Sequence, residues 1–493
     1  MHILMATSEV VPFAKTGGLA DVCGALPQEL VRLGHQVTLF LPAFRQALHS
    51  GRDFVPTDFR LDIPIGGKIV TGRILESSLP GETVKVYLIE QDGYFDRPGL
   101  YVEDNVPYKD NCERFVFFCR GVLEAIRLLG LKCDVMHVHD WQTSLIPAYL
   151  KIEYNRVNGY GDIASLLTIH NMGYQGDFWH WDMAVIGLDW KYYNWQQMEF
   201  WGKVNLLKTG IVFADAINTV SPTYAAEIQT PQFGYGLEGV LQGRRDVLSG
   251  ILNGIDDHDW NPASDPHLPK QFDADSFLVG KAACKAALQS ELGLPVQADV
   301  PLVGFVGRLV DQKGLDLIAP LVERWASTEN VQWAFLGTGD PKYHSWLMRL
   351  KGEFPNRVAA RLEFSNPLAH RIEAGCDLFL MPSQYEPCGL NQMYSLRYGA
   401  VPLVRATGGL ADTITDASPP NVADGSANGF SFVDYTAENL ESTLRRALEV
   451  YRSHPEAWRQ IAVTGMRQDW SWNRSARDYV ALYERMVSAK RRK

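Results

Sequence analysis

Short apolar segments alternate with segments of helical length along the whole chain. The apolar segments are rich in Val, Ile, Leu and Phe, and most of them lack the polar alternation of a strand with one face in water. Strands that are apolar on both faces are typical of parallel sheets covered by helices. The pattern therefore predicts an α/β protein with parallel sheets.

The predicted strands form two groups. Those in the first half of the chain cover residues 3–7, 36–41, 84–89, 134–138, 165–169, 216–220 and 248–252. Those in the second half cover residues 302–306, 331–336, 361–364, 378–381, 401–404 and 430–433. Helical patterns lie between them, for example over 20–33 and 113–129. Each group is sufficient for one doubly wound domain.

The alternation pauses between about Asn253 and Asp299, where turn residues and prolines precede a single helix. Such a stretch is typical of a connection between domains. We therefore expect an N-terminal Rossmann-like domain over 1–253 and a C-terminal one over 254–473. A last helix over 474–493 could pack on either domain. A chain of 493 residues is long enough for two to four domains.

Composition and charge argue against several classes of partner and location. The chain is 46% hydrophobic with a net charge of −10, which disfavours a nucleic-acid partner. No apolar stretch approaches the roughly 18 residues that span a bilayer, so no membrane partner is expected. The first residues predict a strand and not an export signal. The seven cysteines are scattered, which favours free thiols in a reducing cytoplasm.

Polar residues follow the carboxyl ends of the predicted strands. Ligands of open parallel sheets bind beyond these ends. Each residue also has an ordinary explanation, such as a core histidine, a helix cap or half of an ion pair, but their shared placement favours one ligand site. The strands are followed by Lys15 and Asp21, by Asp140 and Trp141, by His170 and Asn171, by Arg308 and Lys313, and by Glu386.

A six-residue sequence occurs twice, over 16–21 and over 407–412. Each copy contains a Gly-Gly pair at the predicted start of a helix. Backbone N–H groups at a helix start favour anions, so each copy is a candidate phosphate site. The alternative is a pair of tight turns.

Two other motifs lack the context that their usual functions require. The sequence over 234–239 matches the dinucleotide fingerprint, but no predicted strand precedes it. Asp257-His258-Asp259 resembles a metal-binding motif of some glycosyltransferases, but it lies in the connection between domains. The chain also lacks the motifs of P-loop nucleotidases, zinc proteases and serine hydrolases. We expect no cofactor and no metal.

Together, the motifs make the chain resemble the bacterial glycogen synthases and plant starch synthases, which are retaining glucosyltransferases of the GT-B fold. The matching segments run in family order: 15–22, 139–141, 170–176, 253–256, 308–314, 386–390 and 405–412. The resemblance implies two facing Rossmann-like domains with a deep cleft between them. It also implies transfer of α-glucose from ADP-glucose to the non-reducing end of an α-1,4-glucan primer, with retention and without a metal, in glycogen biosynthesis.

The resemblance assigns roles by position. Lys15, Gly18 and Asp21 are expected to contact the donor, and Arg308 and Lys313 to hold its diphosphate. Glucose would be contacted by Asp140, Asn171, Asn253 and the carboxylate of Glu386, with His170 beside the anomeric carbon. The matching motifs also imply that substrate contacts Trp141, Cys388, Gly389, Thr407, Gly408, Gly409 and Leu410.

Several alternatives remain open at this stage. Gln142 and Phe95 depart from residues that many family members carry. A glucan phosphorylase-like enzyme, a sugar-nucleotide epimerase and a non-catalytic glucan-binding protein are competing interpretations. The motifs do not decide between ADP-glucose and UDP-glucose, or between a covalent and a same-face mechanism, and the oligomeric state is unknown. An aromatic stretch forms either a glucan platform or the core of an inserted helical lobe; it contains Trp179, Trp181, Trp190, Trp195 and Trp201.

Overall fold

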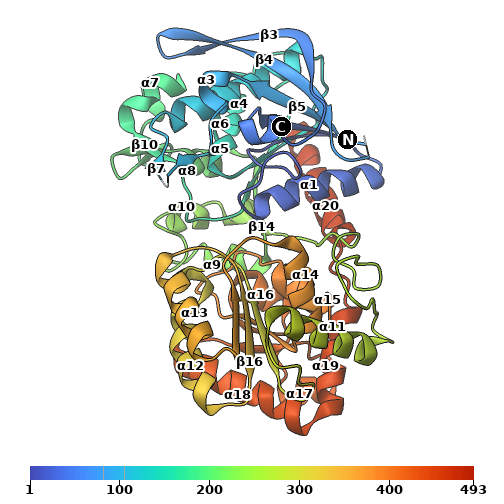
Figure 1. Ribbon diagram of the computed structural model, residues 1–493. Helices are drawn as coiled ribbons and strands as arrows, with labels where there is room; N and C mark the ends of the chain where they lie inside the picture. Colours follow the sequence, from blue (N-terminus) through green and yellow to red (C-terminus); the bar gives the residue numbers. More distant parts are fainter. Residues whose placement is uncertain (82, 105, 493) are drawn as a thin grey trace. The chain divides into compact units, whose positions relative to one another are not determined.

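The computed structural model of the protein describes residues 1–81, 83–104 and 106–492 (Figure 1). The chain divides into two compact units. Unit 1 consists of Met1–Asn253 and the segment from Trp472 to the C-terminus, and unit 2 consists of Gly254–Ser471. Each unit has one main β-sheet with helices, so the predicted α/β class is confirmed.

Unit 1 is built on a nine-stranded sheet with the order β14-β13-β9-β8-β1-β2-β5-β4-β3. The strands from β14 to β5 are parallel, whereas β4 pairs antiparallel with both β5 and β3. The strands are β1 (His2–Ala6), β2 (Gln36–Pro42), β3 (Val55–Ile65), β4 (Lys68–Ser78), β5 (Lys85–Glu90), β8 (Val135–His139), β9 (Ala164–Ile169), β13 (Ala216–Thr219) and β14 (Leu248–Gly250).

The antiparallel hairpin of β3 and β4 corrects the expectation of a purely parallel sheet. Most of the residues in both strands are exposed or half-buried; the buried ones are alternate positions at the end of β3 (Leu61, Ile63 and Ile65) and Gly72, Ile74 and Leu75 of β4. A search for continuous apolar segments misses such strands because one of their faces meets water.

Unit 2 has a six-stranded parallel sheet with the order β17-β16-β15-β18-β19-β20. The strands are β15 (Leu302–Val306), β16 (Gln332–Leu336), β17 (Val358–Arg361), β18 (Leu378–Met381), β19 (Val401–Arg405) and β20 (Phe430–Phe432). The prediction of a strand over 361–364 is wrong, because the strand ends at Arg361. Phe364, which suggested a strand, is 86% exposed, and the buried positions are Val358, Ala359 and Ala360.

Helices complete both units. In unit 1 they are α1 (Gly18–Arg32), α2 (Arg45–Leu48), α3 (Asp92–Phe95), α4 (Asn111–Leu128), α5 (Asp140–Thr143), α6 (Leu145–Ile152), α7 (Met183–Ile186), α8 (Leu206–Phe213), α9 (Pro222–Glu227), α10 (Glu238–Gln242) and α20 (Trp472–Arg491). In unit 2 they are α11 (Phe277–Leu292), α12 (Leu315–Thr328), α13 (Pro341–Glu353), α14 (Asn366–Gly375), α15 (Asn391–Arg397), α16 (Gly408–Thr413), α17 (Pro419–Ala423), α18 (Ala437–Ser453) and α19 (Pro455–Arg467).

The last helix, α20, packs on unit 1 against α1 and β9. It starts at Trp472, two residues before the start of the predicted C-terminal helix. Its buried face carries Tyr479 and Tyr483, which lie one turn apart. Asn218 donates a hydrogen bond to the Tyr479 hydroxyl (3.0 Å), and the Tyr483 hydroxyl lies 2.8 Å from Nδ1 of His137. These polar contacts fix the helix on the first sheet.

The aromatic stretch after Asn171 is not purely helical: it combines short helical turns, including α7, with strands. It contains a small antiparallel sheet with the order β10-β12-β11. Its strands are β10 (Asp177–Trp179), β11 (Glu199–Phe200) and β12 (Lys203–Asn205). The interpretation of the tryptophans as a core is also wrong, because Trp179 is 65% exposed and Trp201 is 84% exposed.

No helix among the described residues is both long enough and apolar enough to cross a bilayer.

Candidate functional site

The loop after β1 is organised by an acidic residue. Both carboxylate oxygens of Glu9 are used: Oε2 accepts hydrogen bonds from the backbone N–H groups of Thr16 (2.5 Å) and Gly17 (3.1 Å), and Oε1 from the hydroxyls of Thr16 and Tyr101. Lys15 Nζ lies 2.6 Å from a carboxylate oxygen of Asp21 on α1. The loop is therefore held in one conformation from within the protein.

This arrangement corrects one part of the prediction that the first Gly-Gly pair offers its amides to an outside anion. The Gly17 N–H is already bound to Glu9, so the anion at this amide is a side chain of the protein. The space next to the two glycines is open: a Cβ atom built on Gly17 or Gly18 would have no atom within 4 Å. Packing therefore does not explain these glycines, whereas close approach of a ligand to the backbone would.

The ends of β8 and β9 bring Asp140 and His170 together. Asp140 has φ 52°, an uncommon conformation for a residue other than glycine, and its side chain accepts a hydrogen bond from the His170 backbone N–H (2.7 Å). The His170 ring lies 3.0 Å from Nδ1 of His139. Residues held in sparsely populated backbone conformations cluster at functional sites. Asp140, which is buried, and His170, which is half-buried, thus form one polar group.

Burial sets the charge of this group. Burial raises the pKa of Asp140 to about 7, with a further contribution from the charge of Glu9. Burial lowers the pKa of His170 to about 3, so its imidazole is neutral at physiological pH. The pKa of His139 is also lowered, by burial and by its neighbours His137 and His170. Asp140 is the member of this group whose charge changes near neutral pH.

We expect Asp140→Asn to stabilise the protein in alkaline solution while reducing activity. The raised pKa means that the folded state favours the protonated carboxyl. The protonated carboxyl contributes fully to the free energy of unfolding below about pH 3.8, and this contribution is lost as the pH rises through about 7. Above pH 7 the ionised carboxylate therefore lowers the free energy of unfolding by up to about 4 kcal/mol. Thermal unfolding at pH 5 and pH 8 tests this, with a larger gain expected at pH 8. An equal gain at both values would contradict it.

Two other predicted sugar contacts, Asn171 and Asn253, lie in unit 1. The side-chain oxygen of Asn171 accepts the Gly173 N–H (2.8 Å). Asn253 is buried, and its Oδ1 has no hydrogen-bond partner among the described residues. A buried amide oxygen without a partner is costly, which is expected where a ligand supplies the donor. Trp141 is 8% exposed and packs edge-to-face on Phe115, so most of its surface serves the core.

In unit 2, Lys313 and Glu386 form an ion pair between the loops after β15 and β18. Lys313 Nζ lies 2.5 Å from Oε2 of Glu386, and the Ser383 hydroxyl donates to the same oxygen (3.0 Å). The carboxylate is buried, with 9% of its side chain exposed, while 21% of the Lys313 side chain is exposed. A buried carboxylate is thus paired with a cation that retains access to solvent.

Arg308 lies on the same loop as Lys313 and is exposed. Its guanidinium donates to the side chain of Gln312 (3.2 Å), and Gln312 donates to the Tyr385 backbone carbonyl (3.2 Å). This chain of contacts links the Arg308 loop to the loop that carries Glu386. Two cationic side chains therefore lie at the carboxyl edge of this sheet, one paired and one exposed.

The second Gly-Gly pair is tightly packed, unlike the first. A Cβ atom on Gly408, which has φ 46°, would lie 2.0 Å from the Glu386 carbonyl oxygen. One on Gly409 would lie 2.1 Å from the Cys388 carbonyl oxygen. The Gly409 N–H is shared between the carbonyls of Glu386 and Pro387 (3.2 Å each), so this amide too is used within the protein.

The other predicted residues of this loop pair are mostly buried. Thr407, Leu410 and Cys388 are all less than 5% exposed, and Gly389 has φ 71°. The structure thus brings the 386–389 and 407–410 segments into direct backbone contact. The two identical six-residue sequences therefore have different local roles, one bordering open space and one joining two loops.

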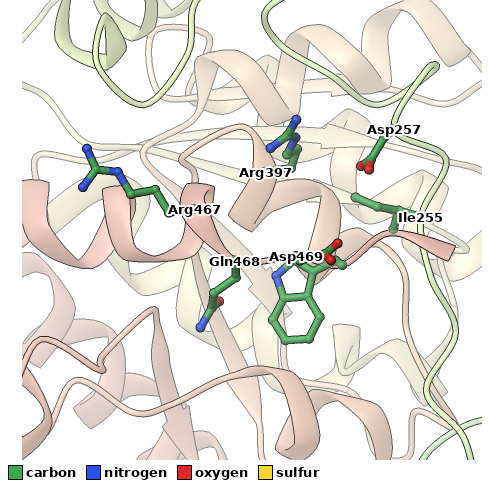
Figure 2. Close-up of a pocket in the computed structure, with 7 residues that line it drawn as sticks. Ile255, Asp257, Arg397, Arg467, Gln468 and Asp469 are labelled. Carbon is green, nitrogen blue, oxygen red and sulfur yellow. The ribbon is translucent and has the colours of Figure 1, made fainter. Parts of the chain in front are cut away.

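The rejected motifs lie elsewhere. The 234–239 sequence forms a turn and the start of α10, with Tyr235 at φ 51°, and it does not follow a strand. Asp257 lines a cavity of about 240 Å³ in unit 2 (Figure 2). Arg397 and Arg467 also line this cavity. The predicted site residues do not line this cavity. Among the described residues, no group of three or more His, Cys, Asp or Glu side chains is placed to hold a metal.

Sequence reasoning missed the residues that support the site. Ser8 and Glu9 lie within three residues of the end of β1 and obey the strand-end rule, so that rule could have found Glu9. Tyr101 and Ser383 lie in loops, and their hydrogen bonds to Glu9 and Glu386 depend on tertiary contacts that no local pattern reveals.

Comparison with known proteins gives consistent matches. Residues 2–243 match the model of the starch synthase catalytic domain, and residues 293–463 match that of glycosyl transferases group 1. The chain is 46% identical to a glycogen synthase of Rhodopirellula baltica over 100% of this chain and 99% of the relative. It is 48% identical to a glycogen synthase of Syntrophotalea carbinolica over 99% of both chains.

A solved structure also matches over the full length. It is the catalytic domain of starch synthase IV from Arabidopsis thaliana bound to ADP and acarbose, with a TM-score of 0.90, 34% identity and 99% coverage of both chains. A sucrose-phosphate synthase from Thermosynechococcus elongatus, at 16% identity and a TM-score of 0.59, shares the fold.

Proposed function

The chain belongs to the family of bacterial glycogen synthases and starch synthases, and from this premise we propose that it transfers α-glucose from ADP-glucose to the non-reducing end of an α-1,4-glucan. It is a glycosyltransferase. The donor, the acceptor and the retention of configuration are parts of the proposal. The observation that carries it is the paired Lys313 and Glu386 with Arg308 at the carboxyl edge of the unit 2 sheet.

The cations in unit 2 suit a nucleoside diphosphate. Breaking the bond between glucose and the diphosphate leaves negative charge on the phosphate oxygens, which a fixed cation stabilises. Arg308 can bind two phosphate oxygens at once, whereas Lys313 acts as a compact charge. Lys313 is already oriented by Glu386, so it needs little reorganisation when the charge develops. We propose that these two residues hold the leaving diphosphate.

The polar group of unit 1 suits the glucosyl side of the reaction. The anomeric carbon becomes positively charged as the bond breaks, and a buried carboxylate such as Asp140 or a backbone carbonyl at His170 would stabilise that charge. The low pKa of His170 keeps its imidazole neutral, so it would not repel the developing cation. The predicted gathering of the residues from both units around one donor stays a prediction.

Glu386 is better placed to bind than to attack. Its Oε2 is engaged by Lys313 and Ser383, which lowers its nucleophilicity. We therefore favour same-face attack, in which the departing phosphate accepts the proton of the glucan hydroxyl, over the two-step route through a covalent intermediate. A trapped glucosyl adduct on Glu386 would contradict this mechanism.

Product analysis tests the proposed function. Labelled ADP-glucose is incubated with glycogen, and the label is followed into polymer, free glucose or glucose phosphate. We expect label in polymer that an enzyme specific for α-1,4 bonds releases, and a lower rate with UDP-glucose. Phosphate-dependent release of glucose 1-phosphate from glycogen would instead support the phosphorylase alternative, and binding without turnover would support a non-catalytic protein.

A further inference from the structure

Unit 1 exposes an unusual set of large aromatic side chains around its small sheet. We call this surface the aromatic face; its tryptophans are Trp179 (65% exposed), Trp181 (53%), Trp190 (44%), Trp195 (74%) and Trp201 (84%). Exposed apolar patches on soluble proteins mark interaction sites. The reaction proposed above does not use these side chains.

Three rings of the aromatic face adjoin one another. The Trp181 ring centroid lies 6.3 Å from that of Trp179 and 5.4 Å from that of Trp190. Trp179 is also paired across β12 with Lys203, which is paired in turn with Phe200, so these three side chains lie on the same side of the sheet. Trp201 follows directly at the turn. Ring contacts thus link Trp190 to Trp179, and strand pairing places Trp179 on the same side of the small sheet as the residues that flank the β11–β12 turn (β10 is labelled in Figure 1).

Trp201 has a backbone conformation that is unfavourable for a tryptophan. It has φ 52° and precedes Gly202 with φ 76°, in the turn between β11 and β12. Two-residue turns with positive φ at both positions favour Asn-Gly because side chains such as Trp are strained there. The ring gains no burial in return, since it is 84% exposed. Folding alone does not account for a tryptophan at this position.

Hydrogen bonds from buried side chains fix the backbone of the aromatic face. Lys208 of α8 is buried and donates hydrogen bonds to the backbone carbonyls of Trp195 (2.5 Å) and Glu199 (2.6 Å). Asn205 donates to the side chains of Gln175 and Asp177 (2.8 Å each). Because this buried ammonium group binds the backbone carbonyls of both Trp195 and Glu199, it fixes the conformation of the segment between them. The exposed rings are thus presented in a defined arrangement.

The chemistry of the surface indicates a carbohydrate. Every large hydrophobic side chain that is exposed between residues 174 and 235, all of which the structure describes, is Trp or Tyr, and none is aliphatic. Protein interfaces also use aliphatic side chains, whereas the rigid faces of aromatic rings stack on the C–H faces of sugar rings. Indole N–H groups at the ring edges remain available to hydroxyls.

The surface also continues from the predicted sugar contacts. Asn171, which follows β9, is followed in turn by Gln175 and Gly176, which accept hydrogen bonds from Asn205 at the end of β12 and from Leu206 next to it. We propose that the aromatic face binds chains of the polymeric α-glucan at a distance from the end that is extended. This inference rests on the proposed function for its choice of polymer.

Kinetics with two acceptors test the inference. The double variant Trp179→Ala/Trp201→Ala is compared with Phe364→Ala, which removes an equally exposed ring from unit 2. For glycogen, we expect the KM of the double variant to rise roughly tenfold or more, while kcat and the KM for maltotriose stay within about twofold of the wild type. Co-sedimentation with glycogen should weaken in parallel. The variant Trp201→Tyr should retain most of the affinity, because the stacking ring is kept.

Several results would overturn the inference. The first is an unchanged KM for glycogen in the double variant, and the second is a KM that rises equally for glycogen and for maltotriose. The third is a changed sedimentation coefficient with unchanged glycogen kinetics, which would show that the face joins two copies of the chain. Wild-type protein that transfers glucose to neither acceptor would instead contradict the proposed function. In that case co-sedimentation with glycogen still decides whether the aromatic face binds the polymer.

Discussion

Replacing Lys313 with alanine is expected to lower kcat by roughly 10²–10³-fold. The ammonium group is oriented by the buried Glu386 carboxylate and retains access to solvent, so it can stabilise charge on a leaving diphosphate without moving far. Loss of one preorganised group that stabilises charge in a transition state typically has an effect of this size. Steady-state kinetics with saturating ADP-glucose and glycogen measure it.

Stability must be measured on the same variant, because Lys313→Ala leaves the buried Glu386 carboxylate with Ser383 as its remaining side-chain partner among the described residues. We expect a loss of about 1–3 kcal/mol in the free energy of unfolding, too little to unfold the protein at 25 °C. Lys342→Ala is the matched control. Lys342 is an exposed lysine that forms an ion pair with Asp311, and Asp311 lies on the loop that carries Lys313. The control should keep its activity. A Lys313→Ala variant that loses stability but keeps kcat would identify a structural lysine.

Replacing Gly409 with alanine is expected to lower kcat/KM by about 10²-fold or more. The added Cβ would meet the Cys388 backbone carbonyl at 2.1 Å, so the 386–389 loop must shift. That loop carries Glu386, and a displacement near 1 Å at a catalytic group can cost about 10²-fold in rate. The free energy of unfolding should fall by about 1–3 kcal/mol, measured by denaturant titration.

Gly18→Ala is the counterpart in the other copy of the repeated sequence. No atom lies within 4 Å of the added Cβ, and Gly18 is the first residue of α1, where alanine is tolerated. We expect unchanged stability together with reduced kcat/KM, because the new methyl group would obstruct the donor. Full activity in Gly18→Ala would mean that no ligand approaches this loop, and full activity in Gly409→Ala would mean that the 386–389 loop is not catalytic.

The sequence predicted the strands that carry the site because their cores are continuous apolar segments. This is why β1, β8, β9, β15 and β18 were found close to their observed positions. The hairpin of β3 and β4 was missed because its exposed face breaks that pattern. The rule that ligands bind at strand ends then located most of the candidate residues without any knowledge of the contacts among them.

The contacts among site residues could not be predicted in the same way. The two copies of the repeated sequence are identical, yet one borders open space and the other packs against 386–388. The Gly17 amide is bound by Glu9, and the Lys313 ammonium is paired with Glu386. Such differences depend on which loops the fold brings together, and a short local sequence does not contain that information.

The role of the aromatic stretch could not be predicted from the sequence either. Its tryptophans have the composition of a core, and only their exposure in the structure distinguishes a surface from a core. Lys208 and Asn205, which hold this surface, lie several residues beyond the stretch. Their role follows from hydrogen bonds and not from any sequence pattern.

The central claim is that side-chain cations of the protein stabilise the leaving diphosphate. The most direct test is the initial rate of glucose transfer from labelled ADP-glucose to glycogen, measured after extensive treatment with EDTA and again after adding Mg²⁺ or Mn²⁺. We predict transfer into polymer at the same rate in both conditions, and a loss of roughly 10²-fold or more in Lys313→Ala under either. Transfer that EDTA abolishes and a divalent metal restores would contradict this account.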